Sequence, residues 1–281
     1  MSSSRREFVG QTASALAAMA CLDKAQPFGS TERLNKIGVQ LYTVRDAMAK
    51  DFDGTLKRVA QIGYQEVEFA GYFGRTPAQV KESLRQAGLS APSTHVDYNT
   101  VKTNWSGALD AALGAGIQYV VVAWIDETDR KTIDDWKRIA DRLNSAARTA
   151  ETAGLRFAYH NHSYEFVPLT GQVPYDVLLA STDPKLVKLE MDLYWITAGG
   201  KNPLDYFARW PGRFPLVHIK DSMGPPKNAM ANVGAGTIDW KAILAKHKEA
   251  GMEHYYVEHD EPADAFGSIT ASYDYLRALR F

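Results

Sequence analysis

After residue 36, the chain alternates short apolar runs with longer segments that have helical periodicity. Eight apolar runs follow one another, at residues 37–41, 67–69, 90–95, 119–123, 157–160, 187–192, 216–219 and 255–258. The run at 119–123 is rich in valine and lacks polar alternation, which is typical of a strand buried on both faces. Eight strands separated by helices predict an α/β fold, a closed parallel (β/α)8 barrel of the TIM-barrel type.

The segments between the runs have the periodicity and the ends of helices. We expect helices at residues 52–62, from 77 to Gly88, and at 134–153. Glycine follows several such segments, and it commonly closes a helix before the chain turns into the next strand. We see no second boundary within residues 36–280 and predict a single barrel domain there. A polar loop at 222–236 follows the seventh run, and we interpret it as a substrate-covering loop.

Residues 1–29 have the features of an export signal. Arg5 and Arg6 precede a short alanine-rich run at 9–22, as in a twin-arginine signal. The run is too short for a stable membrane span. We therefore expect residues 1–29 to be flexible or cleaved and the protein to be periplasmic or otherwise exported. A lipid anchor on Cys21 is not expected, and the alternative to a signal is an ordinary amphipathic helix.

The charge balance excludes some classes of partner. The 281 residues contain 32 Lys and Arg against 33 Asp and Glu, for a net charge of −1. No basic footprint for nucleic acid or an anionic membrane is present. Cys21 is the single cysteine, so an internal disulfide is excluded. The oligomeric state stays open, and a homo-oligomer is compatible with the sequence.

Four metal-type side chains end the fifth to eighth runs: His160, Asp192, His218 and Glu258. In a parallel barrel these ends meet at one face, where active sites lie. Carboxylates and imidazoles without sulfur suit one divalent ion, such as Mn²⁺, Zn²⁺, Co²⁺ or Mg²⁺. Any one of these residues alone is more often a helix cap or an ion-pair partner. Their occurrence on four consecutive strands favours a metal site.

The segment around His160 leaves alternatives open. Read at a period of two, His160 and His162 point to one side, so two imidazoles can share one wall. Both are equally well interpreted as structural histidines of a loop. Glu165 is an alternative ligand that could reach the site in place of His160.

Other residues at the ends of the runs are candidates for binding substrate. We expect Glu68 and His95 to face the metal across the barrel and Trp124 and Trp195 to stack on a sugar ring. Tyr42 follows the first run and is expected at the rim. The competing interpretations are satisfied polar residues at the rim and aromatic core packing.

Several motifs together resemble the xylose-isomerase-like sugar phosphate isomerase/epimerase family over about residues 36–280. These are Tyr159-His160-Asn161-His162, Met191-Asp192-Leu193-Tyr194-Trp195, His218-Ile219-Lys220-Asp221, Gly234-Ala235-Gly236 and Val257-Glu258. The resemblance implies one divalent metal held by Glu, Asp, His and Glu. Asp192, His218 and Glu258 match this pattern, while His160 stands where the first glutamate is usual. The Tyr-His-x-His form also resembles inosose dehydratases.

The resemblance implies abstraction of a proton next to a carbonyl through a metal-stabilised enediolate. Glu258 would be the base, and His160 or His162 the second acid or base. Lys220 would neutralise an oxyanion, unless it pairs with Asp221. The leading interpretation is an isomerase or epimerase of a non-phosphorylated sugar or keto-sugar, since phosphorylated sugars are scarce outside the cytoplasm. The alternatives are a lyase or dehydratase of keto-sugars or 3-keto-glycosides, and a non-catalytic carbohydrate-binding protein.

Overall fold

The computed structural model describes residues 32–281, in which eight parallel strands close into a barrel. Around the barrel the strands are ordered β1-β10-β7-β6-β5-β4-β3-β2. Their bounds are β1 (Gly38–Gln40), β2 (Glu66–Phe69), β3 (Ser90–Asp97), β4 (Tyr119–Trp124), β5 (Arg156–His160), β6 (Val187–Asp192), β7 (Leu216–Ile219) and β10 (His254–Val257). The predicted TIM barrel is confirmed, and each strand lies within two residues of its apolar run. The predicted export signal lies outside the described residues.

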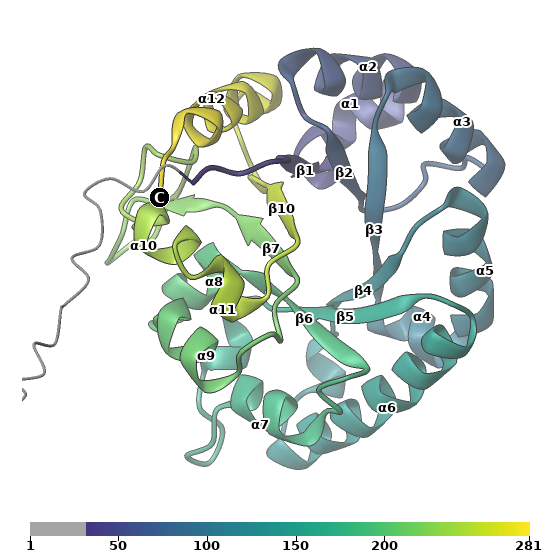
Figure 1. Ribbon diagram of the computed structural model, residues 1–281. Coiled ribbons are helices and arrows are strands. Elements are labelled where there is room, and N and C mark those ends of the chain that lie inside the picture. The colour runs from purple at the N-terminus through teal and green to yellow at the C-terminus, as the bar shows by residue number, and fades with distance from the viewer. Residues whose placement is uncertain (1–31) are drawn as a thin grey trace, which may run out of the picture. The chain divides into compact units, whose positions relative to one another are not determined.

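Helices surround the strands on the outside of the barrel (Figure 1). They are α1 (Arg45–Lys50), α2 (Phe52–Ile62), α3 (Pro77–Ala87), α4 (Tyr98–Thr103), α5 (Trp105–Ala115), α6 (Ile133–Thr152), α7 (Pro174–Ser181), α8 (Leu193–Ala198), α9 (Pro203–Arg209), α10 (Trp240–Leu244), α11 (His247–Ala250) and α12 (Ala265–Ala278). Helix α3 begins with a capping box between Thr76 and Gln79 and ends at Gly88, whose φ of 72° is left-handed. Within residues 32–281, no helix is long and apolar enough to cross a membrane.

The core has two layers, and the alternation of the strands assigns each side chain to one of them. Phe157 and Tyr159 of β5 point outward and pack in the large apolar cluster that includes the helices. Inside the barrel lies a small cluster of five residues: Tyr119, Val121, Ala158, Leu216 and Tyr256. Two residues further along the chain from Ala158, Leu216 and Tyr256, and therefore on the same inner face, are His160, His218 and Glu258. The inner cluster is therefore the floor on which the polar residues of the barrel mouth stand.

At the amino ends of the strands, a second polar group lies below this floor. His254 Nδ1 lies 2.8 Å from Glu66 Oε2, and Lys36 Nζ lies 3.3 Å from Glu66 Oε1. Tyr119 donates a hydrogen bond of 3.4 Å to Glu253, which also pairs with Arg156. These contacts join β2, β4, β5 and β10 at the end of the barrel opposite the mouth.

The loop at 222–236 is more ordered in its contacts than its composition suggested. Strands β8 (Asp221–Ser222) and β9 (Met230–Ala231) form an antiparallel pair directly after β7. Asp221 accepts hydrogen bonds from Trp240 Nε1 and from the backbone of Gly234, at 2.8 Å each. A Cβ at Gly236 would lie only 2.2 Å from Asp221 Oδ1, so this position requires glycine. Asp221 thus anchors the loop and does not pair with Lys220.

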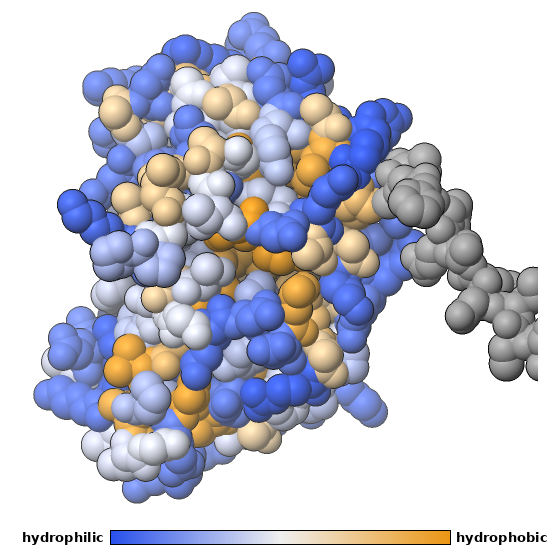
Figure 2. All heavy atoms as spheres, turned by 90° about the vertical axis from the view of Figure 1, so that its left-hand side faces the viewer, coloured by the Kyte–Doolittle hydropathy of each residue, from blue (hydrophilic) through white to orange (hydrophobic). Residues whose placement is uncertain are grey.

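On the side of the barrel that carries α9 and α10, polar residues cover most of the surface (Figure 2). Hydrophobic residues lie between them in smaller groups. Apolar side chains scattered in this way are normal on protein surfaces and need no partner.

Candidate active site

Three of the predicted metal ligands converge at the mouth of the barrel. The ligand atoms of Asp192, His218 and Glu258 all lie within 4.8 Å of one another, and all three residues are buried. His218 Nδ1 is 3.0 Å from Glu258 Oε2 and 3.9 Å from Asp192 Oδ2. Asp192 Oδ1 meanwhile accepts from the backbone of Tyr194 and Trp195, at 2.9 Å each, and so caps α8. The other oxygen of Asp192 is left to face His218.

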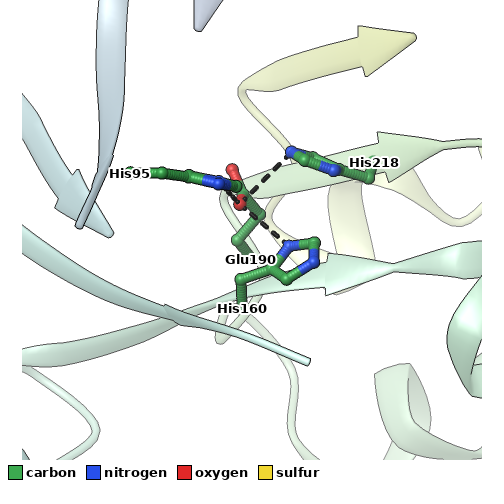
Figure 3. A group of neighbouring side chains, drawn as sticks. All are labelled: His95, His160, Glu190 and His218. Atoms are coloured by element: carbon green, nitrogen blue, oxygen red, sulfur yellow. Dashed lines mark hydrogen bonds and ion pairs between the residues drawn. The ribbon is translucent and has the colours of Figure 1, made fainter. Parts of the chain in front are cut away.

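A second group lies immediately deeper in the barrel. In Figure 3, the rings of His95, His160 and His218 converge on the carboxylate of Glu190. Glu190 Oε2 is 2.7 Å from His95 Nε2, 3.1 Å from His160 Nδ1 and 3.3 Å from His218 Nε2. Glu68 adds a second carboxylate, 2.7 Å from His218 Nε2, and accepts from Gln40 Nε2 at 2.8 Å. His218 therefore belongs to both groups.

Glu190 is a site residue that the sequence analysis missed. It precedes Asp192 by two residues on β6, so a period of two places both carboxylates on the inner face. Only the last carboxylate of that run was assigned to the site. The alternation that was applied to His160 and His162 would also have found Glu190.

The donor set and the unsatisfied oxygens fit a divalent cation. Glu190 Oε1 and Glu68 Oε1 are buried, and among the described residues neither has a hydrogen-bond donor, while the buried Asp192 Oδ2 pairs with Lys220 Nζ at 3.2 Å. A buried carboxylate oxygen without a donor is costly, and a cation would satisfy it. His160 Nε2 lies 3.9 Å from Asp192 Oδ2, so His160 stands beside the mouth group as its fourth expected member.

The alternative ligand Glu165 lies outside both groups, and that prediction is corrected. Its Oε1 accepts a 2.6 Å hydrogen bond from Tyr159, which points outward, and its Oε2 accepts from the backbone of His162 at 2.9 Å. Burial raises the pKa of Glu165 to about 7. The reason is local: the short 3₁₀ helix Tyr164–Phe166 turns this carboxylate toward the outer layer, where it holds the loop that carries His162.

Above the two groups lies a cavity of about 570 Å³, within the range typical of small-molecule sites. Its lining includes nearly all predicted substrate and catalytic residues: Tyr42, His95, Trp124, His160, His162, Trp195, Lys220 and Glu258. Glu68 is the exception, because it is fully buried beneath the cavity. Trp124 is 48% exposed at the rim, and its ring meets that of His162 edge-on at 5.3 Å. Three further acidic residues line the cavity: Asp97, Asp260 and Glu261.

Lys220 is almost completely buried among carboxylates. Its Nζ lies 2.6 Å from Glu258 Oε2, 2.6 Å from Asp260 Oδ1 and 3.2 Å from Asp192 Oδ2. Burial alone would lower the pKa of Lys220, but the three carboxylates raise it. The lysine is therefore charged, and it neutralises part of the negative charge at the mouth.

The histidines of the site differ in their protonation. Burial and the charge of Lys220 lower the pKa of His162 to about 3, so this ring is neutral at pH 7. Burial acts in the same direction on His95, but Glu68 and Glu190 outweigh it and raise the pKa of His95 to about 10. Burial and the charge of Glu68 raise the pKa of Glu190 to about 7. A neutral and a protonated imidazole thus border one cavity.

Comparison with known families agrees with this geometry. The family described as xylose isomerase-like TIM barrel matches residues 56–279. The chain belongs to this family. An inosose dehydratase from Lacticaseibacillus casei is 25% identical over 252 residues, covering 76% of this chain and 84% of the relative. In this xylose isomerase-like family, the similarity thus extends through nearly the whole barrel.

Two solved structures are also similar. A sugar phosphate isomerase/epimerase from Parabacteroides distasonis superimposes with a TM-score of 0.75 at 26% identity, covering 94% of this chain and 98% of the other. The IOLI protein with a bound zinc atom gives a TM-score of 0.69 at 18% identity over 85% of this chain and 95% of its own. The latter likeness shows the fold. The named relatives are dehydratases and isomerases or epimerases, so the family is one of enzymes.

Proposed function

We propose that the chain is a metal-dependent enzyme that removes a proton from the carbon next to the carbonyl of a non-phosphorylated keto-sugar. The observation that carries the proposal is the convergence of Asp192, His218 and Glu258 within 4.8 Å at the base of the cavity. With His160 beside them, these residues would hold one divalent ion, with Mn²⁺, Zn²⁺, Co²⁺ and Mg²⁺ as candidates. Such an ion would supply Lewis-acid polarisation of the carbonyl.

The side chains around this group divide the remaining tasks. Burial would raise the pKa of Glu258, but Lys220 and His218 hold it well below its usual value, so Glu258 is ionised and suited to be a ligand. The neutral ring of His162 lines the cavity and is able to accept the proton. The charged Lys220 is placed to neutralise the oxyanion that forms on the carbonyl. Protonated His95 is the candidate proton donor.

The lining of the cavity supports an uncharged substrate. Of the described lysines and arginines, Lys220 alone lines it, and three carboxylates already surround that charge. A phosphate group would therefore meet a net negative wall. The predicted export signal agrees with this substrate class, since phosphorylated sugars are scarce outside the cytoplasm.

The fate of the deprotonated substrate separates two enzyme classes. We favour elimination of a neighbouring oxygen, as in a dehydratase or lyase. The similarity to an inosose dehydratase supports elimination. An epimerase would use a second carboxylate to return a proton to the opposite face of the sugar, and the buried imidazole of His160 stands where we expect that carboxylate. Reprotonation, as in an isomerase or epimerase, is the second candidate, supported by the 26% identity to the Parabacteroides protein along nearly its full length.

The proposal is tested by following one carbon-bound proton. Purified protein is analysed for metal, reconstituted with Mn²⁺ or Co²⁺, and incubated with a keto-inositol or a keto-hexose in D₂O under NMR observation. We expect about one ion per chain and exchange or loss of the α-proton. A product that has lost one water relative to the substrate identifies a dehydratase, and a product that is an isomer of the substrate identifies an isomerase.

Controls separate the site from the scaffold. Asp192→Ala and His218→Ala should lose the ion, while Glu253→Gln, at the opposite end of the barrel, should keep it. Full metal occupancy in both site variants would contradict the metal assignment. Sugar binding without any α-proton exchange would instead identify a carbohydrate-binding protein.

A further inference from the structure

A second cavity adjoins the candidate active site. It has a volume of about 440 Å³ and is lined by Trp195, Met230, His259, Asp260 and Glu261. Three of these residues also line the cavity above the metal group: Trp195, Asp260 and Glu261. The two cavities therefore adjoin one another at these three residues.

We propose that the second cavity is a subsite for a second sugar ring, so that the enzyme cleaves keto-disaccharides. This inference rests on the proposed function, because it places the keto-sugar ring over the metal group. One ring occupies the first cavity, and the glycosidic oxygen passes the shared wall of Trp195 and Asp260. The second ring then lies against Met230 and His259.

The lining of the second cavity has the chemistry that binds an uncharged sugar ring. The indole of Trp195 and the thioether of Met230 offer apolar surface to the C–H face of a ring. Asp260 and Glu261 offer carboxylate oxygens, which accept hydrogen bonds from hydroxyl groups. His259 Nδ1 is buried, and no described residue gives it a hydrogen bond. Two carboxylates would repel a phosphate, so a neutral ring is the better fit.

The wall that carries Met230 is held in place by the rest of the site. Met230 lies in β9 and pairs with Ser222 of β8. Tyr194 donates a 2.6 Å hydrogen bond to the backbone of Asn228 and so ties this hairpin to α8, the helix that carries Trp195. The hairpin and α8 thus form one unit around the second cavity, which gives the predicted substrate-covering loop a specific role.

Elimination from a two-ring substrate balances without a further reactant. The carbon next to the carbonyl loses its proton to a base, and the electron pair left behind forms a C=C bond with the neighbouring carbon. The bond from that carbon to the glycosidic oxygen breaks, and the oxygen takes up a proton and leaves as a hydroxyl of the second sugar. No oxidant, reductant or water is consumed, and the released sugar lies in the second cavity.

The test compares substrates that differ by one ring, 3-keto-cellobiose and 3-keto-glucose. Met230→Trp fills the second cavity and leaves the metal group untouched. Met223→Trp is the matched control, because Met223 lies in the same loop, is 57% exposed and lines neither cavity. We expect wild-type kcat/KM to be about tenfold higher for the disaccharide, and Met230→Trp to remove most of this advantage. The control should keep it.

Two outcomes would overturn the subsite. One is equal kcat/KM for both substrates in the wild type, and the other is an equal effect of Met230→Trp on both. If neither substrate is turned over, calorimetric binding of the same two sugars to the metal-loaded protein decides. Tighter binding of the disaccharide that Met230→Trp abolishes and Met223→Trp preserves supports the subsite and rejects the proposed reaction. Equal affinities reject the subsite itself.

Discussion

Lys220 Nζ lies 2.6 Å from Glu258 Oε2, with both side chains buried in the mouth of the barrel. Asp192 and Asp260 also contact this lysine, so three carboxylates share one ammonium group, which neutralises part of their charge. Loss of the ammonium group would be costly, because three neighbouring carboxylates, two of them buried, would be left to repel one another.

Replacement of Lys220 should therefore affect stability as well as activity. We expect Lys220→Met, which keeps the length of the side chain, to lower the free energy of unfolding by about 3 kcal/mol without metal. Added divalent metal should restore part of this loss by screening the carboxylates. Urea denaturation with and without Mn²⁺ measures both effects. An equal loss in the two conditions would argue against a metal beside Lys220.

Asp192 has two roles that two variants separate. Its Oδ1 caps α8 and its Oδ2 faces His218. Asp192→Asn keeps an oxygen for the cap but loses the charge. Its metal affinity should therefore fall, while its free energy of unfolding in EDTA should stay close to that of the wild type. Asp192→Ala should lose about 1 kcal/mol more in EDTA. Metal titration and urea midpoints of both variants test this difference, and equal midpoints would contradict the capping role.

The group below the barrel floor predicts acid sensitivity. Burial raises the pKa of Glu66, but His254 and Lys36 outweigh it and lower that pKa. Because the pKa of Glu66 is lower in the folded protein, its carboxylate stabilises the fold above the unfolded pKa of about 4.3. This stabilisation is lost as the pH falls through the lower, folded-state pKa. Wild type should thus exceed Glu66→Gln in stability at pH 6, and the gap should shrink at about pH 3. A gap that widens on acidification would contradict the assignment.

For Glu165, we expect the opposite dependence of stability on pH. Its pKa is raised to about 7, chiefly by burial. The folded protein therefore favours the protonated carboxyl, and stability falls as the pH rises from the unfolded pKa to about 7. Glu165→Gln removes this penalty, so the stability of the variant relative to the wild type should rise between pH 5 and pH 8. Chemical denaturation at the two pH values decides, and a gain at pH 5 alone would refute it.

His162 is expected to control turnover without controlling the fold. Its ring lines the cavity, and its neutral form is the proposed base. His162→Gln should lower kcat by about 10² to 10⁴, the usual contribution of a general base, with little change in metal content. Steady-state kinetics on the metal-loaded protein, with elemental analysis as the control, tests the role. Unchanged kcat would move the base to another residue.

Most of the barrel could be predicted because its signals are local. Apolar runs gave the strands, and the alternation along β5, β7 and β10 placed His160, His218 and Glu258 inside. The orientation of Glu165 depends on a 3₁₀ turn and on its contact with Tyr159, which no periodicity reveals. The partners of Lys220 come from β6 and from the segment after β10, so they follow from closure of the barrel. Asp221, its neighbour in sequence, lies elsewhere in the hydrogen-bond network.

The floor formed by Tyr119, Val121, Ala158, Leu216 and Tyr256 closes the barrel below the two polar groups. Substrate and products would then enter and leave on the opposite side of the cavity, whose rim carries Trp124. A two-ring substrate would have to release its outer sugar before the inner product could escape, which makes release ordered. The freed sugar would accordingly compete with new substrate for binding. Accumulating product would therefore slow the enzyme before the substrate is exhausted.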